Sequence, residues 1–140
     1  MSARTKARKR ALDILYESEL RGLALDGTLR ERAVAREAEG VPVNPYTVQL
    51  VEGVVAHQPQ IDACLQEHAV DWTLARMPAV DRNLLRLGVF EILHVADVPD
   101  AVAISEAVQL ARQLSTDESP PFVNGLLARI VERKSSTTTS

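Results

Sequence analysis

The sequence has little of what disulfides, phosphate loops and aromatic cofactor sites require. In 140 residues there are one cysteine, six glycines and seven prolines, with two Phe, two Tyr and one Trp. The single Cys64 rules out an internal disulfide and favours a reducing compartment. The glycines are scattered singly, so no glycine-rich phosphate loop is expected. So few aromatic residues offer little for an aromatic cofactor cage, and we expect no bound cofactor.

Long apolar runs are also missing. No apolar stretch approaches the ~20 residues that span a bilayer. The N-terminus is cationic, but it leads into alternating apolar and charged residues instead of the continuous apolar region of a signal peptide. We therefore expect one cytoplasmic domain with no membrane partner.

Groupings of catalytic or metal-binding residues are not evident either. His57, His68 and His94 show no metal-ligand spacing with Cys64, and we interpret them as surface or capping residues, with Cys64 in the core. Glu91 is the one candidate catalytic acid. It lies on a helix face expected to be buried, where a carboxylate must be hydrogen-bonded or paired, and no catalytic partner is visible. The sequence therefore predicts neither an enzyme nor a metal site.

Helix signals are present along nearly the whole chain, and no segment shows the sustained alternation of a strand. Asn44 and Pro45 are typical of a helix start, as N-cap and first helical residue. Helices are expected at the N-terminus, over 25–39, over 44–58, after Pro59, over 80–99, and twice more before the C-terminus, with a short turn at "DWTLARMP". The fold class is therefore all-α, with about six or seven helices.

Two of these helices have particular packing requirements. The segment "VDRNLLRLGVFEILHVADVP" (80–99) is apolar almost all round, which is typical of a helix in the centre of a bundle. In the last helix, which Ser119 is expected to cap, Gly125 lies mid-helix and suggests close approach of a neighbouring helix. We expect the packed domain to cover residues 12–133 and the polar residues 134–140 to form a disordered tail.

Positive charge is concentrated at one end. Residues 1–10 contain five cations and no acid, which leaves 11 basic against 19 acidic residues in the rest, a net charge of −8. The apolar stripe of the first helix stops at Leu12, so we expect residues 1–11 to protrude as a flexible segment. Such a charge run is often only a solvated helix face, but this one lacks the acids that usually accompany it. The five cations are Arg4, Lys6, Arg8, Lys9 and Arg10.

Binding to a polyanion is the function that this charge distribution favours. Arginine offers a planar fork of donors to phosphate and lysine a mobile charge, and arginine-rich segments commonly become ordered on RNA. Tyr16 and Phe122 could add base stacking, although core packing is the alternative for both.

Several longer patterns together resemble the NusB transcription antitermination family. They are the central helix with "VDR", "LLR" and "FEIL", the following "P–V–I–EAV–LA" helix and the "FVNG" start of the last helix, all within 78–130. The segment "KARKRALDILYESEL" is similar to the same family's basic entry and first helix. The resemblance covers essentially the whole chain and is weakest over 24–43.

This resemblance implies an all-helical fold of two small subdomains. It also implies binding of the single-stranded boxA element of nascent ribosomal RNA, jointly with the ribosomal protein NusE, in an antitermination complex on RNA polymerase. The five N-terminal cations would be the RNA-binding segment, and Glu118 and Phe122 would lie near the RNA surface. Asp81, with Arg82 beside it, would contact the ribosomal protein.

Three other interpretations remain open at the level of sequence. The RNA-binding domain of some ribosomal RNA cytosine methyltransferases shares this fold, but a methyltransferase would need a catalytic domain after residue 134, so we expect a free-standing protein. A helical protein–protein adaptor would use its cationic end for solubility or for acidic partners. A small helical enzyme has only Glu91 to recommend it. Apolar faces on several helices would also permit a homodimer.

Overall fold

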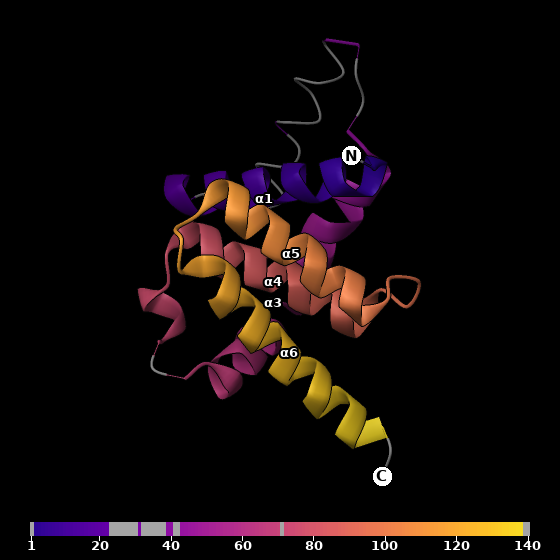
Figure 1. Ribbon diagram of the computed structural model, residues 1–140. Helices are drawn as coiled ribbons and strands as arrows, with labels where there is room; N and C mark the ends of the chain where they lie inside the picture. The colour runs from indigo at the N-terminus through magenta and orange to yellow at the C-terminus, as the bar shows by residue number, and fades with distance from the viewer. Residues whose placement is uncertain (1, 23–30, 32–38, 41–42, 71, 139–140) are drawn as a thin grey trace. The chain divides into compact units, whose positions relative to one another are not determined.

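The chain is all-helical wherever its structure is described. The computed structural model describes residues 2–22, 31, 39–40, 43–70 and 72–138 (Figure 1). Over these residues there are five α-helices, one short 3-10 helix and no strand, which confirms the predicted fold class. The chain divides into two compact units, Met1–His57 and Gln58–Ser140. The elements are α1 (Ala3–Arg21), α3 (Pro45–His68), η1 (Leu74–Arg76), α4 (Ala79–His94), α5 (Asp100–Leu114) and α6 (Ser119–Thr138).

The first unit contains α1 and the start of α3. Ser2 caps α1, because its Oγ accepts a hydrogen bond from the Thr5 backbone N–H at 3.1 Å. The predicted start of the next helix is confirmed, since the Tyr46 N–H donates to Asn44 Oδ1 at 2.8 Å directly after Pro45. Thr47 is fully buried and its hydroxyl donates to the Ala7 carbonyl oxygen at 3.0 Å. This bond connects the two helices of the unit.

The second unit is built around α4, which contacts both α5 and α6, while α5 and α6 also contact each other (Figure 1). Most residues of α4 are buried, as expected of a helix that is apolar nearly all round, and Glu91 is 2% exposed. Gly88 makes the close approach between α4 and α6. A Cβ atom placed on Gly88 would lie 2.9 Å from Leu127 Cδ1, which is closer than atoms normally pack.

Close approach was expected at Gly125, and this expectation is wrong. A Cβ atom on Gly125 would meet only the Arg129 guanidinium, at the ordinary distance of 3.6 Å. Gly88 faces α6 from the middle of the buried helix, whereas Gly125 lies on a half-buried face of α6. The glycine that permits α4 and α6 to approach each other is therefore in α4, whereas the prediction placed it in the last helix.

The helix boundaries differ from the prediction around Pro59 and near the C-terminus. The helices expected before and after Pro59 form the single helix α3, with Pro59 inside it. Proline disrupts a helix interior, but Val54 and Ile61 on either side are both fully buried, and their packing supports a continuous helix. The helix expected over 25–39 lies, apart from Glu31 and Glu39, outside the described residues. Helix α6 continues to Thr138, into the stretch expected to be a polar tail.

Within the residues that the structure describes, none of the helices is sufficiently long and apolar to cross a bilayer.

Candidate nucleic-acid interface

The five N-terminal cations lie on the first turns of α1, which begins at Ala3. Residues 1–11 were expected to form a flexible segment, whereas the described part of this segment is helical from Ala3 onward. Ala7 is 2% exposed and Ala11 is fully buried, so the buried face of α1 continues toward the N-terminus beyond Leu12. The sequence pattern missed this face because its members there are small alanines and not large apolar residues.

Two of the cations are held on one aromatic ring of α3. The guanidinium carbon Cζ of Arg4 lies 4.4 Å from the centre of the Tyr46 ring, and that of Arg8 lies 5.7 Å from it. Both distances are within the range of a cation–π interaction. Tyr46 is itself only 7% exposed. Sequence analysis did not identify Tyr46, although its position directly after the helix start at Asn44 and Pro45 places it on the first turn of α3.

Arg8 differs from the other cations in its burial. Its side chain is 4% exposed, so its guanidinium is not accessible to a phosphate. Burial in this conformation argues against a contact between Arg8 and RNA, and that predicted contact stays a prediction. The physical reason for the burial is helical spacing: Arg8 lies one residue from Ala7 and three from Ala11, on the buried side of α1.

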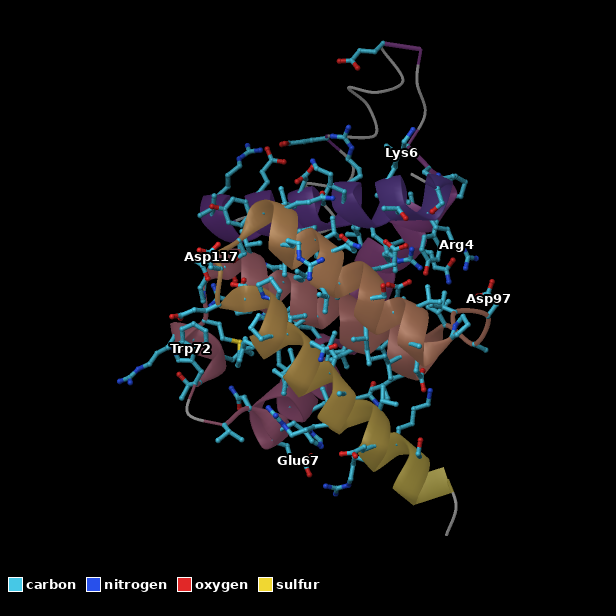
Figure 2. All side chains as sticks on the ribbon, viewed as in Figure 1. Arg4, Lys6, Glu67, Trp72, Asp97 and Asp117 are labelled. Carbon is cyan, nitrogen blue, oxygen red and sulfur yellow. The ribbon has the colours of Figure 1, made fainter. Side chains whose placement is uncertain are left out.

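Lys6, Lys9 and Arg10 present their charge more openly. Lys6, labelled in Figure 2, is exposed. Among the described residues, neither Lys6 nor Arg10 forms an ion pair with a carboxylate. Lys9 Nζ lies 3.4 Å from Asp13 Oδ2, with both side chains almost half exposed. A pair this exposed contributes at most about 1 kcal/mol, so it does not withhold Lys9 from a ligand.

Tyr16 lies farther along α1 and is half-buried. It lines an open depression of about 420 Å³ whose other lining residues include Arg10 and Glu17. The ring is therefore neither fully packed in a core nor fully exposed. Its predicted role in base stacking stays a prediction.

In the second unit, Phe122 pairs with an aromatic residue that sequence analysis did not single out. The rings of Phe122 and Trp72 meet edge to face, with centroids 5.1 Å apart and planes at 84°. Both are half-buried, and Glu118, one turn before Phe122, is exposed. Figure 2 labels Trp72 and also Asp117, in the turn that leads into α6. The roles of Glu118 and Phe122 at an RNA surface stay predictions.

Asp81 and Arg82 both make hydrogen bonds within the second unit, and their predicted role in partner contact stays a prediction. Asp81 is 0% exposed, and its two carboxylate oxygens accept hydrogen bonds from Ser115 and Ser119. The Arg82 guanidinium donates to the carbonyl oxygens of Leu74 and Met77, both at 2.9 Å, and so holds η1 against the start of α4. Both oxygens of the Asp81 carboxylate, and the Arg82 nitrogen that makes these two bonds, are thus engaged within the chain.

Among the described residues no three His, Cys, Asp or Glu side chains come together as a metal site. Cys64 is half-buried, and its desolvation, with a smaller contribution from the negative charge of Glu67, raises the pKa of its thiol. The thiol is therefore protonated at neutral pH, which does not favour nucleophilic chemistry.

Comparison with known protein families matches residues 5–132 to the NusB family. The chain belongs to the NusB family. The transcription antitermination protein NusB of a Nocardioides species is 60% identical to it over 136 residues, which cover 97% of this chain and 98% of the relative. The corresponding protein of Kineococcus radiotolerans is 57% identical over 134 residues, 96% of either chain. The resemblance to the family is thus confirmed.

Solved structures of NusB proteins agree with this fold. T. maritima NusB superposes with a TM-score of 0.79 at 30% identity, over 94% of this chain and 92% of that one. A crystal structure of the antitermination factors NusB and NusE in complex with dsRNA gives a TM-score of 0.79 at 28% identity, over 93% of this chain and 96% of that one.

Proposed function

We propose that this NusB family member is a cytoplasmic transcription antitermination factor that binds RNA together with NusE. In its finer form, the proposal is that the RNA is the boxA element of nascent ribosomal RNA and that the complex acts on RNA polymerase. Family membership supports the general role, because the relatives are transcription antitermination proteins. A similar NusB has been crystallised with NusE and dsRNA, which supports the choice of partners.

The observation that best supports RNA binding in this chain is the separation of charge. Five cations occupy the first turns of α1, while the rest of the chain has a net charge of −8 from 11 basic and 19 acidic residues. A helix that offers cations to phosphate binds electrostatically, and the acidic remainder opposes indiscriminate binding. A basic ribosomal protein would suit that acidic remainder.

Within the basic segment, the proposed contacts to phosphate are Arg4, Lys6, Lys9 and Arg10. Arg8 is omitted because it is buried. If each of the four cations neutralises one phosphate of a single strand, a plot of log K against log[salt] has a slope of about −2.8, taking about −0.7 per contact. With Arg8 included the slope would be about −3.5, so the measured salt dependence tests the role of its burial.

Fluorescence anisotropy tests the function with a boxA-like single strand, a scrambled single strand and a double strand, each with and without NusE. The proposal predicts tightest binding to the boxA-like strand when NusE is present. An adaptor without RNA specificity would bind NusE equally well but show no preference among the three RNAs in either condition. Equal affinity for all three RNAs in the presence of NusE would therefore contradict the proposal.

Charge reversal at Lys6 and Arg10 tests whether these side chains contribute to RNA affinity through their charge, without a loss of folding stability. Lys6→Glu places an acid near the helix N-terminus, where the helix dipole favours it, so we expect no loss of stability. RNA affinity should fall several-fold for Lys6→Glu and for Arg10→Glu. Arg112→Glu is the matched control, because Arg112 is an exposed helical arginine in α5, outside the basic segment. Equal losses in all three variants would indicate only a response to net charge.

The homodimer stays a prediction of the sequence. Sedimentation at increasing protein concentration, with and without RNA, would show whether two copies of the chain associate and whether RNA binding competes with that association.

A further inference from the structure

A buried cluster of hydroxyl groups surrounds Asp81 at the start of α4. Ser115 Oγ donates to Asp81 Oδ1 at 2.5 Å and Ser119 Oγ donates to Asp81 Oδ2 at 2.8 Å. Thr116 Oγ1 lies 2.9 Å from Ser119 Oγ and is placed to donate to it, because the Ser119 proton is engaged with Asp81. Hydrogen bonds from hydroxyls to an ionised carboxylate are short and strong. Asp81 therefore satisfies both of its oxygens with residues from one turn.

That turn is the connection between α5 and α6. Ser115 directly follows α5, and Ser119 is the first residue of α6. The turn is closed by the Ser119 N–H, which donates to the Thr116 carbonyl oxygen at 3.1 Å. One carboxylate on α4 thus anchors the turn at both of its ends.

Two further residues that the family resemblance places near RNA, Glu118 and Phe122, lie in or next to this turn. Glu118 is exposed within it. The Phe122 N–H donates to the Glu118 carbonyl oxygen at 3.4 Å, so the position of Phe122 follows that of the turn. The Phe122 ring in turn contacts Trp72, with centroids 5.1 Å apart. A change in the turn would therefore move Glu118, Phe122 and its contact with Trp72 together.

We propose that Asp81 is a positioning residue for RNA binding: through Ser115 and Ser119 it sets the conformation of the turn that presents Glu118 and Phe122. This inference rests on the proposed RNA-binding function. It is an alternative to the predicted direct contact of Asp81 with the ribosomal protein, and it is supported because the side chain is 0% exposed and both oxygens are already occupied. Substitution of Asp81 should accordingly act on RNA affinity and not on the affinity for NusE alone.

The test uses Asp81→Asn in the full chain, which preserves the size of the side chain but replaces one acceptor with a donor. We expect RNA affinity in the presence of NusE to fall about tenfold, because at least one buried hydrogen bond is lost and the turn can rearrange. NusE affinity without RNA should be unchanged. Trp72 is the only tryptophan in the chain, so its emission maximum and its quenching by acrylamide report on the turn without any ligand. Both should change in Asp81→Asn.

Asp100→Asn is the matched control. Asp100 is also an acid in the first turn of a helix and also has a specific partner, Lys134 Nζ at 3.0 Å, but it makes no contact with the turn over 115–119 among the described interactions. This variant should leave Trp72 emission and RNA affinity unchanged. Ser115→Ala and Ser115→Thr form a second pair, in which the alanine removes the hydroxyl and the threonine retains it. The alanine should weaken RNA binding and the threonine should restore it.

The possible outcomes separate the inference from the proposed function. If Asp81→Asn binds RNA like the wild type, or loses NusE affinity while Trp72 emission stays constant, the inference is wrong. If Asp81→Asn does not fold, the two Ser115 variants decide, and equal RNA affinity for alanine and threonine overturns the inference. If the wild-type chain with NusE binds no RNA, the proposed function fails, and a Trp72 response confined to Asp81→Asn would still show that Asp81 positions the turn.

Discussion

The guanidinium of Arg4 lies over the ring of Tyr46, with Cζ 4.4 Å from the ring centre. The two residues come from different helices, α1 and α3, and Arg8 approaches the same ring at 5.7 Å. The basic segment is therefore organised by an aromatic residue more than thirty positions away in the sequence. A segment held in this way loses less conformational entropy when it binds than a disordered one would.

Replacement of Tyr46 tests this organisation. Tyr46→Leu removes the π face, and we expect the free energy of unfolding to fall by about 1–3 kcal/mol from the lost cation–π contacts and the smaller side chain. Hydrogen exchange should accelerate at the amides of the first turns of α1. Tyr46→Phe keeps the ring and should cost less in both measurements. Equal losses for leucine and phenylalanine would assign the effect to the hydroxyl instead of the ring.

Deletion of residues 1–10 should destabilise the chain, contrary to what a flexible segment would show. The deletion removes Ala7, whose carbonyl oxygen accepts the hydrogen bond of the buried Thr47 hydroxyl at 3.0 Å. A buried hydroxyl without a partner costs about 1–3 kcal/mol, and a urea titration should detect a loss of that size. Lys6→Gln with Arg10→Gln is the control, since it removes charge without removing packing and should leave the urea midpoint nearly unchanged. An unchanged midpoint for the deletion would mean that the first turns of α1 do not pack in solution.

Alanine substitution at two glycines should have effects of opposite sign. Gly88→Ala puts a methyl group 2.9 Å from Leu127 Cδ1, and such overpacking typically costs about 1–3 kcal/mol. Gly125→Ala meets only the end of a flexible arginine at 3.6 Å. It should stabilise α6 by about 0.5–1 kcal/mol through helix propensity. Thermal unfolding of the two variants checks both values, and a stabilising Gly88→Ala would contradict the close contact of α4 with α6.

The Cys64 thiol should titrate at a higher pH than an ordinary cysteine. Burial, together with the charge of Glu67, raises its pKa in the folded chain. Because the folded pKa lies above the unfolded one, this group's contribution to stability is complete below the unfolded pKa and is lost as pH rises through the folded pKa. The rate of alkylation by iodoacetamide should therefore reach its midpoint at a higher pH than in an unstructured cysteine peptide. Glu67→Gln should lower that midpoint, and a midpoint equal to that of the peptide would show that the thiol is not desolvated.

Local sequence patterns were sufficient for much of the fold. The helix start at Asn44 and Pro45 was predicted correctly, because an N-cap and a first-position proline are recognisable from neighbouring residues alone. The burial of α4 was also predicted correctly, because its own residues show that it is apolar nearly all round. The continuous helix through Pro59 was not predicted, because proline by itself disfavours a helix interior. The burial of Val54 and Ile61 on either side depends on packing that the local sequence does not reveal.

The candidate site shows the same division. The five cations and their separation from the acidic remainder are evident from the sequence, because charge is a property of residue type. The burial of Arg8, the role of Tyr46 and the pairing of Phe122 with Trp72 are not, since each depends on which side of a helix meets another segment.

The sequence by itself determined that the chain is helical, that it belongs with the NusB family and that its positive charge lies at one end. Only the tertiary structure decided which of those charges remain accessible and that Asp81 is turned inward to hold the start of α6. The physical reason is that helix propensity and charge are local properties, whereas burial and hydrogen-bond partnership are set by residues that folding brings together from distant parts of the chain.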